Sequence, residues 1–180
     1  MDDIATELGI SKKTIYQFFK DKDEIVYQVV KQLIEMDRSE FESVCNNAED
    51  AIDELVQMSM CLRKNITKVN PSLLYDIQKY HPRSWALWMD FKHDFIKQNV
   101  FTSIEKGKKE GMFREEIEAE ILATFRIQQV EMAFDNTIFP RKEFEFAEVQ
   151  MALFDHFVHG LLTVKGQENY EKLLNTQENA

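Results

Sequence analysis

The chain has 180 residues, of which 44% are hydrophobic and 12% aromatic, so it can bury a core and is not disordered. Its 22 basic and 32 acidic side chains give a formal net charge of −10 at pH 7, which argues against a surface devoted wholly to nucleic acid or anionic membrane but allows a local basic patch. Only five Gly and three Pro leave few places to turn, which argues against β-sandwiches, barrels and glycine-rich α/β folds and predicts an all-α fold of long helices.

The start of the chain and its cysteines bear on the cellular compartment. The acidic start Met1-Asp2-Asp3 is not a secretory signal, and no apolar run approaches the roughly 18 residues that a transmembrane helix needs. We therefore expect a cytoplasmic protein with no membrane partner. Cys45 and Cys61 fall in helical patterns without a Cys-x-x-Cys spacing, which gives little support to a disulfide framework or a zinc site. We expect two ordinary thiols, no metal and no cofactor.

The beginning of the chain predicts two short helices followed by a long one. The first helix stops at Gly9, where a left-handed residue can end it, and Ser11 can cap the second. Asp21 can cap the third helix, which follows two apolar stripes and is interrupted near Asn46. The two short helices are expected over residues 3–8 and 12–19.

Helical periodicity then resumes and continues, with two proline breaks, almost to the end of the chain. Pro71 and Pro82 delimit a brief helix, and Gly111 ends a later one after a lysine-rich last turn. The tail over residues 166–180 is polar, and we expect it to fray. The four longer helices are expected over residues 48–67, 85–109, 116–136 and 144–164.

The last two of these helices carry apolar residues on two faces each. A helix that packs on its own domain by one face needs a partner for the other, and two such neighbours can build the four-helix interface of a twofold dimer. We expect a homodimer on this ground, and the alternative is a helix pair buried at the centre of its own bundle. The residues expected at the dimer interface are Phe146, Val149, Leu153, Phe157 and Leu161.

Residues 4–25 carry the most specific motif of the chain. It consists of a helix-turn stretch Ile-Ala-x-x-Leu-Gly-Ile-Ser, then Thr-Ile-Tyr-x-x-Phe, then Lys-x-Lys-x-x-Ile. This string closely resembles the helix-turn-helix of the TetR family of transcriptional regulators. The resemblance implies an all-α protein with a helix-turn-helix DNA-binding domain over residues 1–40. A larger helical-bundle domain for ligand binding and dimerisation would follow over residues 41–180.

The second helix of the motif is the predicted DNA-reading helix. Between Ser11 and Lys22, four lysines and one aspartate give a local charge of +3 within an acidic chain. Lys12, Lys13 and Gln17 carry donors that can reach base edges in a major groove. The resemblance implies phosphate contacts from Thr14, Tyr16 and Lys22. The full set expected to contact an operator in double-stranded DNA is Ser11, Lys12, Lys13, Thr14, Tyr16, Gln17, Lys20 and Lys22.

Family members have a complete helix before the stretch that matches here, whereas this chain begins inside the second helix of that unit. Without the preceding helix, Ile4, Leu8 and Phe19 would be partly uncovered, at about 1.5–3 kcal/mol for each exposed large apolar side chain. We therefore expect the natural protein to be longer at this end, or these residues to be poorly ordered.

Aromatic residues gather between Pro71 and Phe101, in the domain that the resemblance assigns to a small-molecule ligand. We expect an apolar, aromatic cavity there, and the alternative is that these side chains fill a core. A nearby carboxylate, Asp76, Asp90 or Asp94, would favour a hydrophobic cation. The residues expected to line the cavity are Tyr75, Tyr80, Trp85, Trp88, Phe91, Phe95, Phe125 and Met132.

We predict a homodimeric TetR-type repressor, released from its operator by a small apolar or aromatic ligand, rather than an enzyme. His156 and His159 are three residues apart and could share a metal, but no Glu-x-x-His repeat accompanies them. The sequence has no phosphate-cradling glycine loop and no nucleophile elbow. The alternative function is an acidic helical protein-interaction module that no longer binds DNA.

Overall fold

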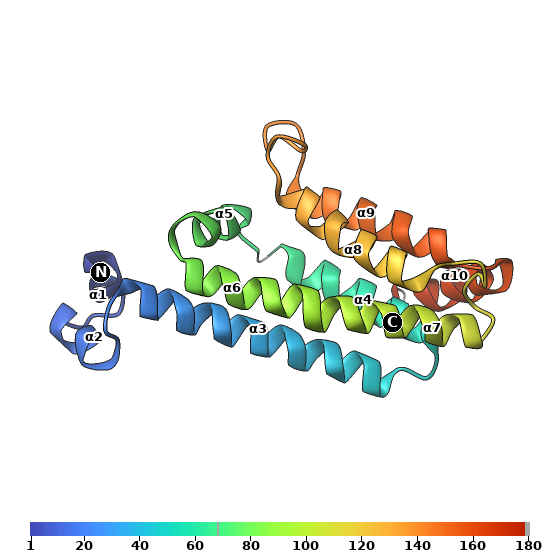
Figure 1. The fold of residues 1–180 in the computed structure, drawn as a ribbon, viewed down its shortest axis with the longest axis horizontal. Coiled ribbons are helices and arrows are strands. Elements are labelled where there is room, and N and C mark those ends of the chain that lie inside the picture. Colours follow the sequence, from blue (N-terminus) through green and yellow to red (C-terminus); the bar gives the residue numbers. More distant parts are fainter. Residues whose placement is uncertain (68, 179–180) are drawn as a thin grey trace.

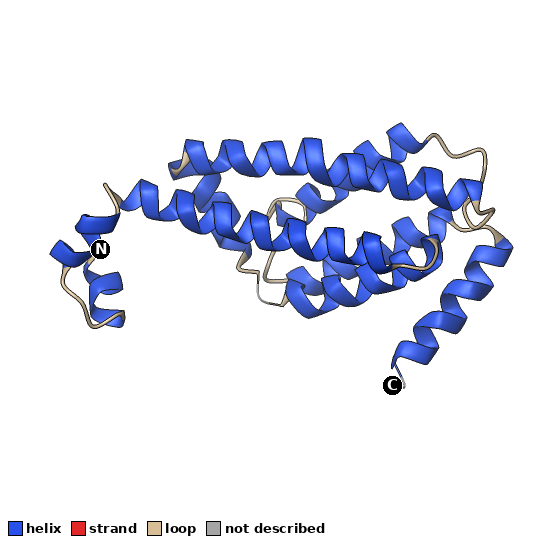
Figure 2. Cartoon of the chain, turned by 90° about the horizontal axis from the view of Figure 1, so that it is seen from below, coloured by secondary structure: helices blue, strands red, loops and turns tan. Residues whose placement is uncertain are grey.

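The computed structural model describes residues 1–67 and 69–178, and this part of the chain is almost entirely helical (Figure 1). Within it, Figure 2 draws no strand, and the β-type contact is an isolated bridge between Phe113 and Leu162. The all-α prediction is confirmed. In chain order the helices are α1 (Asp2–Glu7), α2 (Lys12–Phe18), α3 (Lys22–Asn47), α4 (Ala51–Ile66), α5 (Pro71–Tyr80), α6 (Pro82–Asp90), the π-helix η1 (Phe91–Ile96), α7 (Lys97–Lys109), α8 (Ala119–Phe134), α9 (Phe146–Leu161) and α10 (Val164–Glu178).

Helices α1 and α2 form a small unit at one end of the long helix α3 (Figure 1). Gly9 between them has a φ of +64°, a conformation that glycine adopts without strain. The Ser11 hydroxyl accepts a hydrogen bond from the Thr14 amide at 3.1 Å, and the Asp21 carboxylate accepts one from the Glu24 amide at 2.8 Å. The predicted turn and both predicted caps are therefore present.

Helix α3 continues from this unit into the helical bundle, where it packs against α4 and α6. The rings of Phe41 and Phe95 meet edge to face, 5.7 Å apart, and join α3 to η1. Helices α6, η1 and α7 follow one another without a break, and this rod begins at Pro82 instead of Trp85 because proline suits the first turn of a helix. The domain boundary expected after residue 40 falls inside α3, so this helix links the two units.

The main hydrophobic core lies where α4, α7, α9 and α10 meet. Ile52 and Val56 of α4 are four residues apart and point into it together with Ile104 of α7 and Val158 of α9; each is 2% exposed or less. A smaller cluster joins the end of α4 to α8 and α9. The bundle is therefore held together by side chains far apart in the sequence.

Residues 166–178 of the tail are helical and do not fray as predicted, and residues 179–180 of that prediction lie outside the described residues. The helical residues belong to α10, which packs against α4. Tyr170 is 3% exposed within the main core, and Leu173 and Leu174 pack beside it. At Gly166 a Cβ atom would meet the Met112 carbonyl oxygen at 2.2 Å, so glycine permits this close approach. The polar composition of the tail obscured an apolar stripe that recurs at helical spacing.

The α9 side chains predicted for a dimer interface pack inside the chain instead. Phe146 and Val149 belong to the smaller cluster and Phe157 and Leu161 to the main core, and each is 7% exposed or less. Leu153 is half-buried. Side chains already enclosed within one chain have little area left to bury against a second copy, so this burial does not favour these residues as the interface, and their role stays a prediction.

The outward faces of α8 and α9 carry different residues. Ile121 and Phe125 on α8 are 65% and 49% exposed, and they lie four residues apart on one side of the helix. On α9 the outward face includes Ala152 and His156. We call these four residues the α8–α9 face.

Candidate nucleic-acid interface and ligand cavities

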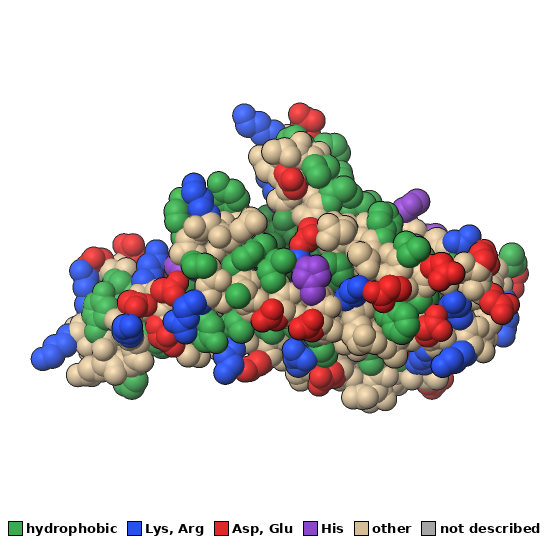
Figure 3. Space-filling view, viewed as in Figure 1, with side chains coloured by type: hydrophobic (Ala, Val, Ile, Leu, Met, Phe, Trp, Pro, Cys, Tyr) green, Lys and Arg blue, Asp and Glu red, His purple; other side chains and the backbone are tan. Residues whose placement is uncertain are grey.

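Helix α2 offers polar side chains to solvent on the side turned away from α1. Ile15 is the buried residue of α2, and Ala5 is that of α1, where the two helices contact each other. Lys13, Tyr16 and Gln17 are exposed, and Lys13 and Gln17 share one face because they are four residues apart. Lys and Arg side chains project from this end of the molecule in Figure 3. The exposed face of α2 thus presents amine, amide and hydroxyl groups.

Lys12 has a partner within the same unit. Its ammonium group forms an ion pair with the carboxylate of Asp2 in α1, and the hydrogen bond from Lys12 lowers the pKa of Asp2. Both side chains are exposed, so water and salt screen this pair. Lys12 would exchange Asp2 for a base edge on binding, which leaves Lys13 and Gln17 as the more accessible of the three predicted base readers.

The remaining predicted contacts lie at the ends of two helices. Lys20 and Lys22 are exposed beside the first turn of α3, whose amides carry the positive end of the helix dipole. The hydroxyls of Ser11 and Thr14 are 2.8 Å apart and hydrogen bond to each other. Ser11 therefore acts first as the cap of α2, and Tyr16 carries the more accessible hydroxyl.

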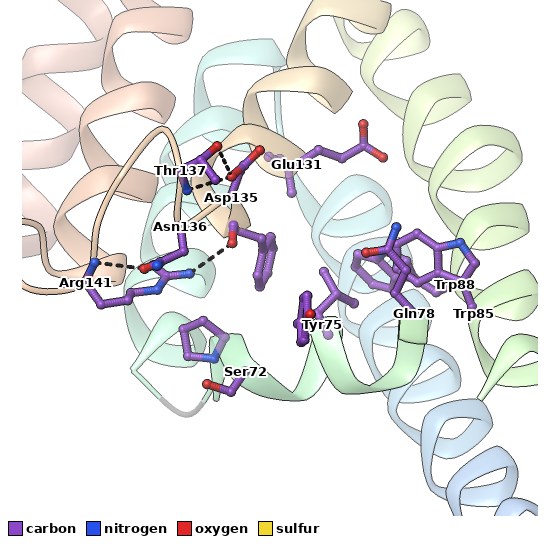
Figure 4. Close-up of a pocket in the computed structure, with 14 residues that line it drawn as sticks. Ser72, Tyr75, Gln78, Trp85, Trp88, Glu131, Asp135, Asn136, Thr137 and Arg141 are labelled. Atoms are coloured by element: carbon purple, nitrogen blue, oxygen red, sulfur yellow. Dashed lines mark hydrogen bonds between the residues drawn. The ribbon is translucent and has the colours of Figure 1, made fainter. Parts of the chain in front are cut away.

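A cavity of about 770 Å³ lies between α5, α6, α8 and the loop after α8, and we call it the α8 cavity (Figure 4). Tyr75 of α5 and Trp85 and Trp88 of α6 form its aromatic side. The surface is visibly hollowed between α5 and the α8–α9 pair, with hydrophobic side chains in the hollow (Figure 3). The volume lies in the range of roughly 300–1,000 Å³ that is typical of small-molecule sites.

The charged groups of the α8 cavity already have partners within the chain. Glu131 is bonded to the ammonium group of Lys92, which is 1% exposed, and burial lowers the pKa of Lys92. Asp135 accepts hydrogen bonds from the hydroxyl and amide of Thr137 at 2.7 and 2.8 Å, and these bonds lower the pKa of Asp135. Arg141 is satisfied only in part: its Nη2 donates to the Phe134 carbonyl at the end of α8 at 3.3 Å, whereas its buried Nη1 has no hydrogen-bond partner among the described residues.

A second cavity of about 1150 Å³ runs along α3, between that helix, α4 and α5, and we call it the α3 cavity. It shares three wall residues with the α8 cavity, Leu74, Trp88 and Phe134, so the two cavities adjoin. Its α3 wall is apolar for much of its length and also contains Asp37 and Glu40. The helical bundle thus holds two neighbouring cavities with different lining chemistry.

Comparison with known proteins agrees with this geometry. Residues 1–29, which include the Gly9 turn and all of α2, match the model of bacterial regulatory proteins of the tetR family. The chain is also 28% identical over 165 residues to the HTH-type transcriptional regulator YvaF of Bacillus subtilis (strain 168), which covers 89% of this chain and 84% of YvaF. The two matches support a TetR family transcriptional regulator, as the motif in residues 4–25 predicted.

Solved structures of TetR-like fold match nearly the whole chain. A TetR-family regulator from Agrobacterium tumefaciens superposes with a TM-score of 0.71 at 17% identity, covering 90% of this chain and 86% of its own. A transcriptional regulator from Cytophaga hutchinsonii ATCC 33406 gives 0.68 at 17% identity, covering 91% and 88%. The ketosteroid transcriptional regulator KstR2 of Mycobacterium tuberculosis gives 0.63 at 15% identity, covering 89% and 83%. These matches support the fold.

Three of the eight residues predicted to line a ligand cavity do line the α8 cavity: Tyr75, Trp85 and Trp88. Phe91 and Phe95 line neither cavity and instead stack on each other, 5.4 Å apart, between α3 and η1. The core-filling alternative therefore holds for these two rings.

The other three predicted ligand residues also lie outside both cavities. Tyr80 is exposed near the end of α5, Phe125 belongs to the α8–α9 face, and Met132 is half-buried. The carboxylates considered for a cation, Asp76, Asp90 and Asp94, are exposed and line neither cavity. The sequence suggested that these three residues and three carboxylates would lie near the aromatic segment. The direction of each side chain, however, depends on packing between distant helices.

Sequence reasoning missed two parts of the cavity walls. The loop after α8 contributes Asp135 and Arg141 to the α8 cavity, and the only local signal was its Asp-Asn-Thr turn composition. The acidic pair of the α3 cavity, Asp37 and Glu40, was hidden because both lie on a charged stretch of α3 that resembles a solvated helix face.

The two histidines considered as metal ligands lie in different surroundings. The ring of His159 is hydrogen bonded through Nδ1 to the side-chain oxygen of Gln167 at 2.9 Å and meets Tyr170 edge to face, so it helps to hold α10. His156 is exposed on the α8–α9 face. In the part of the chain that the structure describes, no three His, Cys, Asp or Glu side chains form a metal-binding group.

None of the described helices is both long and apolar enough to span a bilayer.

Proposed function

We propose that this TetR-family regulator binds an operator as a homodimer through the exposed face of α2 and releases it when a small molecule occupies the bundle. The single observation that carries the DNA-binding part is the capped helix α2, which exposes Lys13, Tyr16 and Gln17. Donors on one face of a short helix suit the edges of bases in a major groove, and neighbouring lysines suit phosphates.

The test is a selection of bound duplexes from a random pool, followed by titration of the selected fragment in low-salt buffer. Enrichment of a palindromic sequence with half-sites about one helical turn apart supports a dimer that reads two successive major grooves. Failure to retain any duplex would favour the alternative, an acidic helical module that works through protein contacts.

The α8–α9 face supports the proposed dimer. Exposed Ile121 and Phe125 form an apolar stripe, which is costly to leave in water and favourable to bury against the same stripe of a second copy. Ala152 on the neighbouring helix is small enough to let two helices approach closely, and His156 lies beside it. A twofold axis through this face would pair α8 and α9 with their copies in a four-helix arrangement.

A polar junction supports communication between the cavities and the pair of helices α1 and α2, which we call the reading unit. The Nδ1 atom of His81, at the corner between α5 and α6, lies 2.7 Å from the Asp23 carboxylate in the first turn of α3. Arg83 lies 3.5 Å from the Glu24 carboxylate, and its guanidinium group stands 4.5 Å over the ring of Tyr27.

This junction lies between the aromatic wall of the α8 cavity and the start of α3, which follows the reading helix directly. A ligand that moves α5 or α6 would therefore act on the position of α2 through the corner residues. Release follows if the ligand favours a conformer whose two reading helices no longer match successive grooves.

A further inference from the structure

The reading helix α2 exposes one hydrocarbon side chain among its polar groups. Phe18 is 77% exposed, and among the large apolar side chains that the structure describes only Val164 is more exposed. Phe18 is the last residue of α2, so the helix backbone fixes its position. Figure 3 shows hydrophobic side chains beside Lys and Arg side chains at this end of the molecule. The other exposed residues of the helix carry amine, hydroxyl or amide groups: Lys12, Lys13, Tyr16 and Gln17.

Helical spacing places Phe18 on one flank of the reading face. An α-helix turns by about 100° per residue, so Gln17 lies opposite the buried Ile15 and points away from α1. Thr14 and Phe18 are four residues apart and share one flank, whereas Tyr16 lies on the other. A helix that enters a major groove turns its flanks toward the two walls of the groove. Phe18 therefore faces the same wall as Thr14.

No contact within the chain accounts for the exposed ring. Among the described residues, ring stacking and cation–π contacts do not include Phe18. The contact between α1 and α2 buries Ala5 and Ile15 instead. The ring thus extends the face that carries the proposed DNA contacts, and a duplex on that face is the surface that would cover it.

The wall of a major groove contains apolar groups as well as phosphates. The C5-methyl group of thymine projects into the groove, and Phe is one of the side chains that contact it. The carbon atoms of deoxyribose line the same wall. An aromatic ring cannot donate a hydrogen bond to a phosphate as the neighbouring hydroxyls and amines can, but it gains free energy when hydrocarbon removes it from water.

We propose that Phe18 packs against the apolar groups of the groove wall, thymine methyl or deoxyribose carbon, and so contributes to operator affinity without neutralising a phosphate. A contact to a thymine methyl would also contribute to the choice of operator. This inference rests on the proposed function, for which it names a DNA contact of a different chemical kind from the lysines and hydroxyls.

The test compares the full chain with Phe18→Ala on the duplex selected from the random pool. Fluorescence anisotropy at several salt concentrations gives the affinity and its salt dependence. We expect Phe18→Ala to bind about tenfold more weakly, because the ring loses its apolar contact. The slope of log affinity against log salt concentration should stay the same, because a hydrocarbon releases no counterion. Phe18→Leu keeps a hydrocarbon at this position and should lose about threefold or less.

Uracil substitution distinguishes the two apolar partners. Each thymine of the half-site is replaced in turn by uracil, which lacks the C5-methyl group and keeps the base pair. At a contacted thymine, the unaltered chain should lose about threefold in affinity, and Phe18→Ala should lose nothing further. If no uracil duplex weakens the unaltered chain while Phe18→Ala still binds tenfold more weakly, the partner of the ring is deoxyribose.

Leu8→Ala is the matched control. Leu8 is also an exposed hydrocarbon of the reading unit, at 62%, but it follows α1 and does not lie on α2. Its replacement should change the affinity by no more than about twofold, as is usual for an exposed position outside an interface. Urea unfolding of each variant shows whether the reading unit and bundle keep their stability, so that a loss of affinity is not mistaken for a loss of fold.

Three results would overturn the inference: an unchanged affinity of Phe18→Ala, a loss accompanied by a smaller salt slope, or an equal loss in Leu8→Ala. Failure of this inference can be told apart from failure of the proposed function. If the unaltered chain retains the selected duplex and Phe18→Ala retains it equally well, DNA binding stands and the role of Phe18 fails. If the unaltered chain retains no duplex at all, both fail.

Discussion

The reading unit and the helical bundle differ in how they are built and in how readily their sequences can be interpreted. In α1 and α2 the buried residues are Ala5 and Ile15, while Leu8 and Phe18 are 62% and 77% exposed. The bundle encloses a large core from α4, α7, α9 and α10. Yet the family motif lies in the small unit, over residues 4–25, and the bundle carries no comparable pattern.

The difference follows from what each region has to do. A surface that reads a duplex needs particular donors at fixed positions on one helix, so its sequence is restricted residue by residue. A core needs apolar side chains of suitable volume and accepts many combinations of them. A motif therefore identifies the reading unit, whereas the bundle must be seen in three dimensions before its cavities can be recognised.

The largest expected effect tests the contrast in packing. Phe157→Ala should lower the free energy of unfolding by about 3–5 kcal/mol, because it empties a well-packed site in the main core. Phe18→Ala removes the same atoms from an exposed position of α2 and should change the free energy of unfolding by about 0.5 kcal/mol or less. Urea unfolding followed by circular dichroism measures both values. Similar losses in the two variants would mean that Phe18 is covered in solution.

The next effect concerns the α8–α9 face. Ile121→Asp and Phe125→Asp should each weaken self-association by about 2 kcal/mol or more, roughly 30-fold, since apolar anchors dominate interfaces. Sedimentation equilibrium would then detect monomers at concentrations where the unaltered chain is dimeric. Val164→Asp is the control, because Val164 is 78% exposed at the start of α10, outside this face. Dimers that survive both changes would place the interface elsewhere.

Much of the fold could be predicted from sequence because helix signals are local. Ser11 and Asp21 cap the helices expected of them, and Gly9 and Gly111 have the positive φ expected where a helix ends. Such signals depend on a few neighbouring residues and survive any tertiary arrangement. The tail was the exception, because most residues around Tyr170 and its apolar neighbours in the sequence are polar.

The candidate sites were predicted unevenly for the same reason. The positions on α2 follow from one short segment, and the structure places Lys13 and Gln17 on its exposed face. The stripe on α9 that was predicted for a dimer is largely buried within the chain, and five of the eight residues predicted to bind a ligand line neither cavity. Apolar periodicity marks a face without saying whether a neighbouring helix already covers it. Asp37 and Glu40 line the α3 cavity together with residues of α4 and α5, a neighbourhood that the sequence pattern does not reveal.

A smaller effect addresses how the reading unit holds DNA. Tyr16→Phe together with Lys22→Ala should weaken binding by about 2 kcal/mol on all duplexes alike, because phosphate contacts carry no sequence information. The slope of log affinity against log salt concentration should fall by about 1. Fluorescence anisotropy on the selected operator and on single-base variants measures both. Gln17→Ala is the contrasting variant, whose loss should concentrate at one base pair; a loss from the double change confined to one base pair would contradict the assigned roles.

The smallest expected effect lies at the junction that joins the two regions. Arg83→Ala removes a partly exposed contact to Glu24 and Tyr27, and such pairs contribute about 0.3–1 kcal/mol, so local opening should become up to roughly fivefold more frequent. Hydrogen exchange should accelerate in the first turns of both α3 and α6, because the contact bridges them. Arg63→Ala, which removes an exposed contact 4.0 Å from Asp155 inside the bundle, should leave α3 unchanged. If only α6 responds to Arg83→Ala, the corner does not couple the cavities to the reading helix, and the two regions would act on each other along the body of α3.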